Sequence, residues 1–326
     1  MSANAISIGL SAAIVSVEGE QPCALVVTHE GCEDALPFGP FDPGSQRTLE
    51  QGLRKWVGEQ THFDLGYTEQ LYTFGDHGRH SPSAAAEGAP GTRVVSVGYL
   101  ALTRQSKDDG TGAARDTRWQ GWYHYFPWED WRDDKPQMIE RVILPRLKSF
   151  VKNAASPQGA ELRRDRIRLC FGVDGIPWDE EKVLERYELL YEAGLVREFA
   201  RDSGLSPRST GEQAEETLGA AMMFDHRRIL ATAIARLRGK MKYRPVVFEL
   251  MAPSFTLLEL QRTVEALLGQ RLHKQNFRRL VAEQGLVEGT GKFAASARGR
   301  PAELFRFRRE VLRERPAPGL RLGVRR

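Results

Sequence analysis

The pattern of apolar and polar positions in the first part of the chain predicts strands. Residues 5–17 and 23–28 are rich in Ile, Val and small side chains and are separated by a short polar stretch, so they predict a β-hairpin. Residues 93–102 and 119–126 have the β-branched and aromatic composition of two further strands.

One helix and two long loops are predicted between these strands. Apolar residues recur at helical spacing from Leu49 to Val57, which predicts a helix over 48–60. Residues 78–91 and 106–116 are full of Gly, Ser, Pro and charged residues, which is typical of loops. The first 130 residues therefore predict a domain of mixed α and β structure.

After residue 137 the apolar positions recur at helical spacing. Two helices are predicted, and the buried face of the first has Ile139, Val142, Ile143, Leu147 and Val151, while that of the second has Val183, Tyr187, Leu190, Tyr191, Leu195 and Phe199. A third apolar stripe from Leu218 to Leu237 predicts one long helix leading into the last part of the chain. Residues 204–211, which contain Gly and Ser-Pro, predict the joint before it.

The segment after residue 252 has the pattern of two short helices and a hairpin. Thr256 and Glu259 are three residues apart and predict a capping box at the start of the first helix, which Gly269 ends. The second helix is predicted over 273–284, and residues 286–307 predict a β-hairpin with a Gly-rich tip. This order is typical of a winged helix, in which the second helix enters the major groove of DNA.

Length and composition indicate more than one domain. A chain of 326 residues with 41% hydrophobic residues can bury more than one core. Its apolar runs are far shorter than the ~20 residues that span a bilayer, and no leader pattern opens it, so a cytoplasmic protein without a membrane anchor is expected. The three cysteines, Cys23, Cys32 and Cys170, are widely spaced, which favours reduced thiols over disulfides or a zinc site.

Charge divides the chain into two unlike parts. Residues 227–326 contain 23 Lys and Arg against 8 Asp and Glu, a net charge of +15. The residues before them contain 24 basic and 35 acidic side chains, a net charge of −11, so the overall +4 hides the division. A basic surface favours the approach of phosphates, and the alternative is a solvated basic tail.

Ten side chains of the basic segment are candidates for contact with double-stranded DNA. Arg and Lys can address guanine, Asn and Gln can pair with adenine, and the remaining cations can neutralise phosphates. The candidates are Thr256, His273, Lys274, Gln275, Asn276, Arg278, Arg279, Lys292, Arg298 and Arg300. Phe277, Leu280 and Val281 are predicted to face the core instead. For each cation alone, a solvated charge is the alternative, and a His at a helix start such as His273 is often structural.

Several segments of this region resemble, in order, the signatures of the Nudix-related transcriptional regulators. The match covers residues 222–307, and its segments are residues 224–230, 235–240, 255–261, 276–279 and 299–307. The resemblance implies that this chain is a repressor of genes for NAD synthesis or salvage. It also implies that the repressor acts as a homodimer on palindromic operator DNA.

The fold that the resemblance implies is α+β: an N-terminal Nudix-like α/β/α sandwich, a helical connector and a C-terminal winged helix-turn-helix. The predicted divisions are a Nudix-like effector-binding domain over 1–155, a helical connector or dimerisation extension over 156–225, the winged helix over 226–312 and a basic tail over 313–326. The largely helical stretch 129–215 is longer than the usual connection of the family, and it is either a dimer interface or a lid.

A catalytic Nudix box needs a Gly-opened loop followed by a helix with the sequence R-E-U-x-E-E, in which U is apolar. Residues 36–44 resemble the loop, and residues 54–59 align with the helix if one extra residue is allowed. The three glutamates of the pattern hold a divalent metal, and their places are taken here by Lys55, Gly58 and Glu59. Only one of three carboxylates is left, so we expect no catalytic residues, no metal site and no enzyme activity.

The resemblance implies that this degenerate domain senses an adenine nucleotide, either ADP-ribose, NAD or ATP. Residues 67–76 and 93–99 resemble ligand-domain motifs of the family. Lys55 is predicted to supply part of the positive charge that Mg²⁺ gives an active enzyme, whereas Arg54 either contacts the ligand or orients a carboxylate. The predicted effector-binding residues are Arg54, Lys55, Glu59, Arg93, Tyr99 and Trp122. The alternatives are an amphipathic helix with no site and aromatic residues that belong to the core.

The sequence therefore predicts a ligand-controlled transcriptional regulator, expected to be a repressor, that requires no cofactor. Its predicted partners are operator DNA, a nucleotide effector and a second copy of the chain. One alternative is an active Nudix hydrolase of ADP-ribose or NAD-type diphosphates. Another is a protein that binds nucleic acid without sequence preference.

Overall fold

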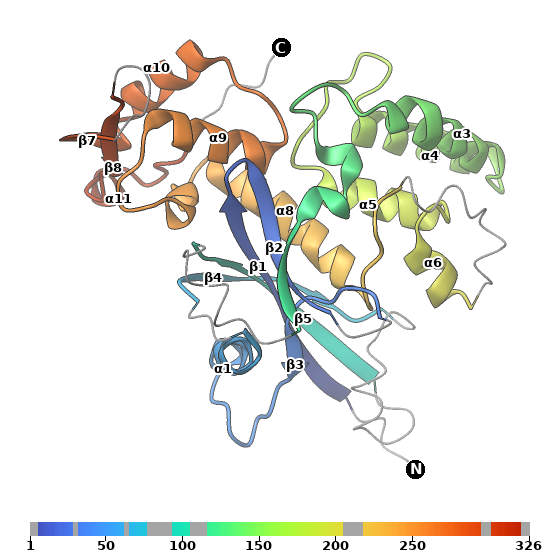
Figure 1. Cartoon of the computed structure of the whole chain (residues 1–326). Coiled ribbons are helices and arrows are strands. Elements are labelled where there is room, and N and C mark those ends of the chain that lie inside the picture. Colours follow the sequence, from blue (N-terminus) through green and yellow to red (C-terminus); the bar gives the residue numbers. More distant parts are fainter. Residues whose placement is uncertain are drawn as a thin grey trace.

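A mixed β-sheet is the centre of the N-terminal part of the chain (Figure 1). The computed structural model describes residues 6–28, 32–61, 65–76, 93–104, 116–204, 218–294 and 301–320. Within these ranges the strands of the sheet are β1 (Ile6–Glu18), β2 (Gln21–Val27), β3 (Phe38–Pro40), β4 (Tyr67–Phe74), β5 (Arg93–Leu102) and β6 (Thr117–Gly121). Their order is β4-β5-β1-β2-β6, and β3 pairs with β1. The pair β1 and β5 is parallel, and the other pairs are antiparallel.

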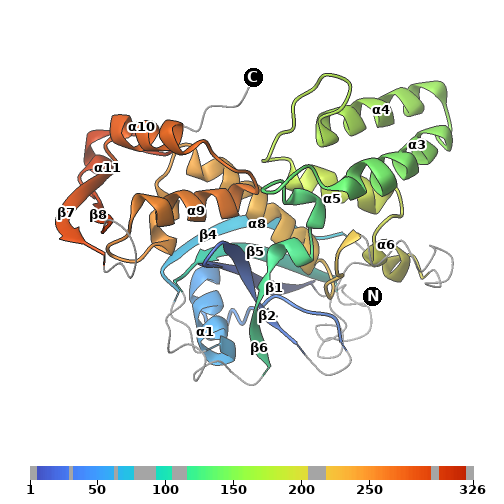
Figure 2. The ribbon, with the colours of Figure 1, turned by 45° about the horizontal axis from the view of Figure 1, so that its top comes forward.

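Helices cover both faces of this sheet, because the residues of β1 alternate between two cores. Leu10, Ala12 and Ile14 pack in one cluster with residues of α1 (Leu49–Thr61), whereas Ala13 and Val15 pack in the other cluster with residues of α8 (His226–Met241). Figure 2 shows α1 and α8 on opposite sides of the strands. The predicted α/β/α sandwich is confirmed.

Most of the strands predicted from the sequence form where they are expected. The hairpin of β1 and β2, strand β5 and helix α1 confirm the predictions for residues 5–28, 93–102 and 48–60. Strand β4 was not predicted as a strand, and its side chains alternate poorly because the register shifts between Gln70 and Thr73. The predicted loops 78–91 and 106–116 lie almost entirely outside the described residues.

The strand predicted over 119–126 is partly wrong, because β6 ends at Gly121. The chain then forms the 3₁₀ helices η1 (Trp122–His124) and η2 (Pro127–Glu129). Trp122, Tyr125 and Phe126 are all fully buried. An extended strand would point successive side chains to opposite faces, whereas these turns bring the aromatic rings into one core.

A helical extension follows the sheet and lies beside it (Figure 1). Its elements are a π-helix η3 (Ile139–Ile143), α3 (Leu144–Lys152), α4 (Pro157–Phe171), α5 (Val183–Glu192) and α6 (Arg197–Asp202). The π-helix precedes Pro145, which cannot donate a backbone hydrogen bond to the preceding turn. It shifts the buried face, so that Leu144 is buried and Val142 only partly.

Two predicted helices are shorter than expected, because the backbone turns at residues with positive φ. The helix predicted through Phe199 breaks after α5, where Gly194 has a φ of 70°. The long helix predicted from Leu218 is wrong, since α8 begins at His226 after Phe224 with a φ of 53°. Residues 205–217, which contain most of the predicted joint, lie outside the described ranges.

The C-terminal part has the order expected for a winged helix. Its elements are η6 (Val246–Leu250), α9 (Leu257–Leu268), α10 (Lys274–Gln284), β7 (Val287–Phe293), β8 (Glu303–Phe307) and α11 (Val311–Glu314). Strands β7 and β8 pair as an antiparallel hairpin. Helix α8, predicted as the first element of this domain, packs on β1, β4 and α5 as well as on α9. The predicted domain boundaries stay a prediction.

A buried ionic cluster joins the sheet, the helical extension and the winged helix. The Glu129 carboxylate accepts hydrogen bonds from Arg186 Nε (2.5 Å) and Arg238 Nη1 (2.7 Å), and all three side chains are buried. Arg238 Nε also donates to the carbonyl of Leu267 at the end of α9 (2.8 Å). Because buried charges must be paired, this cluster fixes where α9 lies on the rest of the molecule.

The helices of the described ranges are all too short or too polar to cross a membrane.

Candidate nucleic-acid interface and nucleotide site

Helix α9 begins at the capping box predicted from the sequence. Thr256 Oγ1 accepts a hydrogen bond from the Glu259 backbone N–H (3.2 Å), and Glu259 Oε2 accepts one from the Thr256 N–H (2.6 Å). Gly269, with a φ of 71°, ends the helix. A Cβ at Gly269 would lie 2.3 Å from the carbonyl oxygen of Glu129. Both the positive φ and this close approach therefore require glycine at position 269. The hydroxyl of Thr256 therefore serves the helix cap.

Helix α10 presents a row of donors to solvent. Phe277 and Val281 are buried, as predicted, and hold the helix against α9, while Leu280 is partly buried. The predicted DNA-binding residues of this segment are all exposed: His273, Lys274, Gln275, Asn276, Arg278 and Arg279. Among the described residues, only Arg279 of this group has a side-chain ion pair, with Glu283 at 3.8 Å. The other side chains are not used to hold the fold.

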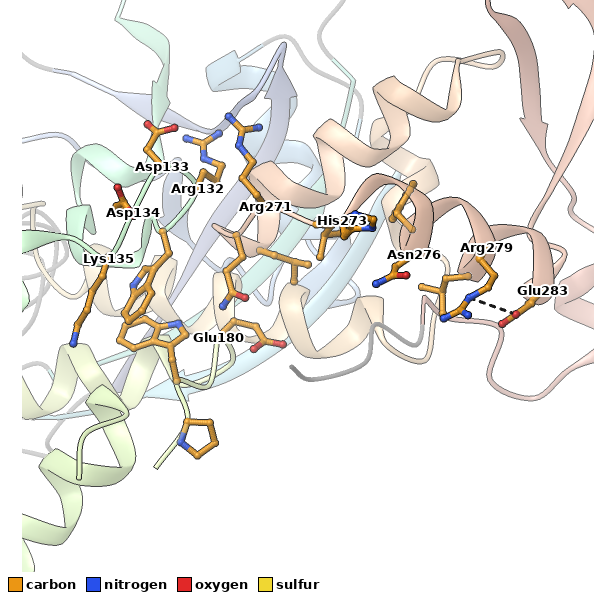
Figure 3. Close-up of a pocket in the computed structure, with 18 residues that line it drawn as sticks. Arg132, Asp133, Asp134, Lys135, Glu180, Arg271, His273, Asn276, Arg279 and Glu283 are labelled. Atoms are coloured by element: carbon orange, nitrogen blue, oxygen red, sulfur yellow. Dashed lines mark ion pairs between the residues drawn. The ribbon is translucent and has the colours of Figure 1, made fainter. Parts of the chain in front are cut away.

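A cavity of about 900 Å³ lies beside α10. Some of the exposed side chains of α10 line this cavity and others do not. Asn276, Arg279 and Glu283 of α10 line one side of it, and Asp134 and Lys135 lie across from them (Figure 3). Trp131 and Trp178 also line the cavity. Lys274, Gln275 and Arg278 do not line it. The helix therefore has one polar face toward the helical extension and another toward open solvent.

The wing is attached to the start of α9 by backbone and ring contacts. Phe255 and Phe305 exchange two backbone hydrogen bonds of 2.8 and 2.9 Å, and the rings of Phe248 and Phe307 stack with centroids 4.4 Å apart. Lys292 lies on β7 and is exposed. Arg298 and Arg300, predicted at the tip, lie outside the described residues. The described part of the wing thus contains one of the three predicted wing cations, Lys292.

The loop that resembles a Nudix loop is tied to α1. Trp56 Nε1 donates to the carbonyl of Pro40 (2.7 Å), and Gln60 Nε2 donates to that of Phe38 (2.8 Å). A Cβ at Gly39 would lie 2.2 Å from the Trp56 indole, so the indole can lie on the loop only because position 39 is glycine. The sequence resemblance of this loop therefore corresponds to a packed loop and helix.

Arg54 is used to join α1 to β4. Its guanidinium donates to Glu50 Oε1 (3.0 and 3.1 Å), to Thr68 Oγ1 (3.0 Å) and to the carbonyl of Leu65. The hydrogen bond from Thr68 and that from Arg54 lower the pKa of Glu50. Of the two roles left open for Arg54, the geometry favours orienting a carboxylate. Glu50 and Thr68 are not among the predicted site residues, although Glu50 stands one helical turn before Arg54.

The three positions of the metal carboxylates do not form a metal site. Lys55 and Glu59 are exposed on α1, with Lys55 Nζ 4.0 Å from Glu59 Oε1. Gly58 faces open space, since a Cβ there would meet nothing within 4 Å. In the described ranges no three His, Cys, Asp or Glu side chains are grouped so that they could hold a metal ion. These residues do not fit a divalent cation, because one carboxylate paired with a lysine cannot supply the oxygen ligands that such an ion needs.

The remaining predicted effector residues are dispersed. Tyr99 is 4% exposed and packs with Leu53 and Val57 beneath α1, and burial raises the pKa of its hydroxyl. Trp122 is fully buried in the other core, so its indole is not placed to stack on a ligand beside α1. Arg93 begins β5, but its side chain lies outside the described part of the structure. Arg54, Lys55 and Glu59 are thus exposed on α1, whereas Tyr99 is buried beneath that helix.

Comparison with known proteins decides what the C-terminal domain is. Residues 247–307 match the family described as the NrtR DNA-binding winged helix domain. Residues 247–307 form a winged helix of the NrtR type. The sequence resemblance to Nudix-related regulators is confirmed. The NrtR-type domain includes α9, α10 and both strands of the wing.

A curated relative shares sequence with part of this chain. The ADPR responsive transcriptional repressor NtrR of Acinetobacter baylyi is 43% identical over 93 residues, which are 28% of this chain. The match spans 37% of the length of that relative.

Two solved structures share the fold over nearly the whole chain. Shewanella oneidensis NrtR superimposes with a TM-score of 0.53 at 19% identity, covering 93% of this chain and 95% of NrtR. The same protein in complex with a 27mer DNA gives a TM-score of 0.51 at 20% identity, covering 93% and 94%. At this identity the likeness shows the fold: a Nudix-like domain followed by an NrtR-type winged helix.

Proposed function

We propose that this chain is a transcriptional repressor that binds operator DNA through its NrtR-type winged helix and is controlled by an adenine nucleotide. The observation that carries the proposal is the row of exposed donors on α10, of which only Arg279 has a side-chain ion pair in the described part of the fold, with Glu283 at 3.8 Å. Lys and Arg side chains on a recognition helix can contact guanine and phosphates, and Asn and Gln can contact adenine.

The proposed DNA contacts follow the geometry of α10 and the wing. Lys274, Gln275 and Arg278 lie on its open face, and Asn276 and Arg279 lie on the side of the cavity. His273, Lys292, Arg298 and Arg300 are proposed as phosphate contacts, and Thr256 contributes by fixing the start of α9. A homodimer would present two such helices to the half-sites of a palindrome, about 34 Å apart for one turn of DNA.

The proposed effector is ADP-ribose, because the Acinetobacter relative is described as ADPR responsive. Lys55 lies exposed on α1 beside the Nudix-like loop, where it can attract a diphosphate without a metal ion. Glu59 and Arg93 are proposed as further contacts of the diphosphate nucleotide, Arg54 is proposed to orient Glu50, and Tyr99 is proposed to support α1 from beneath. Calorimetry with excess EDTA tests this part: we expect ADP-ribose to bind with unchanged affinity, and loss of binding on chelation would contradict a metal-free site.

We propose that the genes controlled by this chain are genes for NAD synthesis or salvage. The test is a mobility-shift assay of the full chain on promoter DNA of such genes in its own genome, with ADP-ribose, NAD or ATP added separately. We expect one promoter to be retarded and ADP-ribose to change the fraction bound. If none is retarded, the proposal fails. A Mg²⁺-dependent loss of ADP-ribose during the assay would favour the hydrolase instead.

A variant separates the two proposed sites. Arg279→Ala removes a donor that has only a weak surface ion pair, so we expect weaker binding to the retarded promoter and unchanged ADP-ribose binding. Lys292→Ala is the control on the wing, expected to weaken all DNA sequences alike. Loss of both DNA and nucleotide binding in Arg279→Ala would indicate a folding defect.

A further inference from the structure

The tip of the β1–β2 hairpin contacts the helix-turn-helix through one carboxylate. Glu20 Oε2 lies 2.8 Å from Arg271 Nη1, and Glu20 Oε1 lies 3.3 Å from Arg262 Nε. Arg262 is on α9, and Arg271 is in the turn between α9 and α10. Figure 1 shows the two strands running from the sheet up to α9. A residue of the Nudix-like domain thus neutralises two cations of the winged helix.

This contact is built into the fold. Gly19, with a φ of 60°, makes the tight turn before Glu20, and the carbonyl of Glu20 accepts a hydrogen bond from Arg132. Arg132 is itself buried and paired with Asp130. The backbone of the hairpin tip is therefore held in place independently of the Glu20 side chain. The carboxylate can leave the two arginines without unfolding the hairpin.

The two arginines remain accessible although they are paired. Their side chains are 50% and 46% exposed for Arg262 and Arg271, so they are not structural cations of the interior as Arg238 is. Arg271 also contacts the buried carboxylate of Glu265, at 3.1 Å. Without Glu20, Arg271 would keep Glu265 as a partner, whereas Arg262 would have no ion pair among the described residues, which leaves a net positive charge at this place.

We propose that Arg262 and Arg271 bind DNA phosphates and that Glu20 is an internal competitor for them; this rests on the proposed DNA binding. In a helix-turn-helix the first helix crosses the DNA backbone, and the turn directly precedes the helix in the groove. Carboxylate and phosphate oxygens bind a guanidinium with the same geometry, so the two anions exclude one another. DNA binding then requires the hairpin to give up its ion pairs.

Glu20→Gln tests the proposal, because it removes the charge and keeps the size of the side chain. Glu18→Gln is the matched control on the same hairpin, since Glu18 is exposed and has no ion pair among the described residues. Binding of the full chain to a mixed-sequence 30-bp duplex is followed by anisotropy at salt concentrations from 50 to 200 mM. Each added phosphate contact steepens the salt dependence by about 0.9 in log–log slope, which is about 3-fold over this range.

We expect Glu20→Gln to bind this duplex at least about 3-fold more tightly than Glu18→Gln at low salt, with a slope steeper by about 1 to 2. Arg262→Gln with Arg271→Gln is expected to change both quantities in the opposite direction and to abolish the effect of Glu20→Gln. If Glu20 only holds the domains together, Glu20→Gln binds no more tightly than Glu18→Gln, and the proposal is overturned. A wild-type chain that binds no DNA would overturn the proposed function as well.

Discussion

Helices α8 and α10 are both rich in basic residues, yet their cations have different uses. On α8, Arg227 pairs with Glu198 at 3.3 Å, Arg238 pairs with Glu129 at 2.7 Å, and Lys240 pairs with Glu69. On α10, the basic side chains are exposed and bound weakly or not at all to the described part of the chain. A count of charges along the sequence cannot separate these two uses, whereas burial and pairing do.

This difference changes the meaning of the charge division. Part of the +15 of residues 227–326 is cancelled by carboxylates of the acidic part, at Glu129, Glu198, Glu69 and Glu20. The opposite charges of the two parts therefore attract one another within the molecule. The charge that is not cancelled in this way favours binding to DNA. Buried, paired cations such as Arg238 are not accessible to a polyanion, whereas exposed cations are.

The largest expected effect is on the buried cations of α8. Arg238→Met removes one of two cations around Glu129, and breaking a buried ion pair costs about 3–5 kcal/mol of unfolding free energy. Denaturant unfolding measures it. Arg166→Met is the control, since the pair of Arg166 with Glu192 is about half exposed and is worth less than about 1 kcal/mol. Equal effects of the two variants would remove the distinction between paired and free cations.

The next effect is a pH dependence carried by the first residue of α8. Burial lowers the pKa of His226 to about 3, and its Nδ1 accepts a hydrogen bond from the Leu36 N–H (3.1 Å). Between pH 6.5 and 3 the unfolded chain therefore binds a proton that the folded chain does not, so stability falls with decreasing pH by about 1.4 kcal/mol per unit. This contribution is complete above the unfolded pKa and is lost as the pH falls toward 3.

His226→Gln should remove this dependence, because a glutamine oxygen can accept the same hydrogen bond without titrating. Between pH 7 and 4.5 we expect wild type to lose about 2–3 kcal/mol more than the variant, as measured by denaturant unfolding at each pH. His124→Gln, at an exposed imidazole, is the control and should behave like wild type. Parallel pH curves for wild type and His226→Gln would contradict the buried neutral imidazole.

The third effect is expected on α10, where a substitution should change the affinity for DNA and leave the stability of the fold unchanged. Asn276→Ala removes an exposed amide that is suited to adenine, so operator affinity is expected to fall by about 1–3 kcal/mol, or roughly 5- to 150-fold, at unchanged unfolding free energy. Binding to operators with single base changes is the measurement. A loss of stability comparable to that of Arg238→Met would mean that α10 is structural like α8.

The smallest effect is expected at the ion pair within α10. Glu283→Gln removes the partner of Arg279 at 3.8 Å, where the two side chains are 73% and 66% exposed for Arg279 and Glu283. We expect a change of less than about 0.5 kcal/mol in unfolding free energy, in contrast to the buried pairs of α8. A change above about 1 kcal/mol would show that Arg279 is held structurally and is a poor candidate for DNA contact.

Local features of the winged helix could be predicted from the sequence. The capping box of Thr256 and Glu259, the glycine end of α9 and the buried face of α10 are set by residues within one or two helical turns. The alignment of Lys55 with a metal carboxylate of the Nudix box is also an inference of this local kind, and it stays a prediction.

Long-range contacts could not be predicted. Glu129, Arg186 and Arg238 are far apart in the sequence and meet only when η2, α5 and α8 pack together. The same holds for Glu20 and Arg271, and for Trp122, whose aromatic neighbours suggest a strand although the fold buries them all. Side chains that look alike in sequence acquire a structural or a binding use through tertiary packing.

The proposed function requires that one chain binds both nucleotide and DNA and that each ligand changes the affinity for the other. The most direct measurement is a pair of titrations at fixed salt: retarded promoter DNA with and without ADP-ribose, and ADP-ribose with and without that DNA. Linkage requires the two affinities to change by the same factor, typically about 5- to 150-fold. We expect equal factors well above one. Unchanged affinities in both titrations would contradict the proposed function.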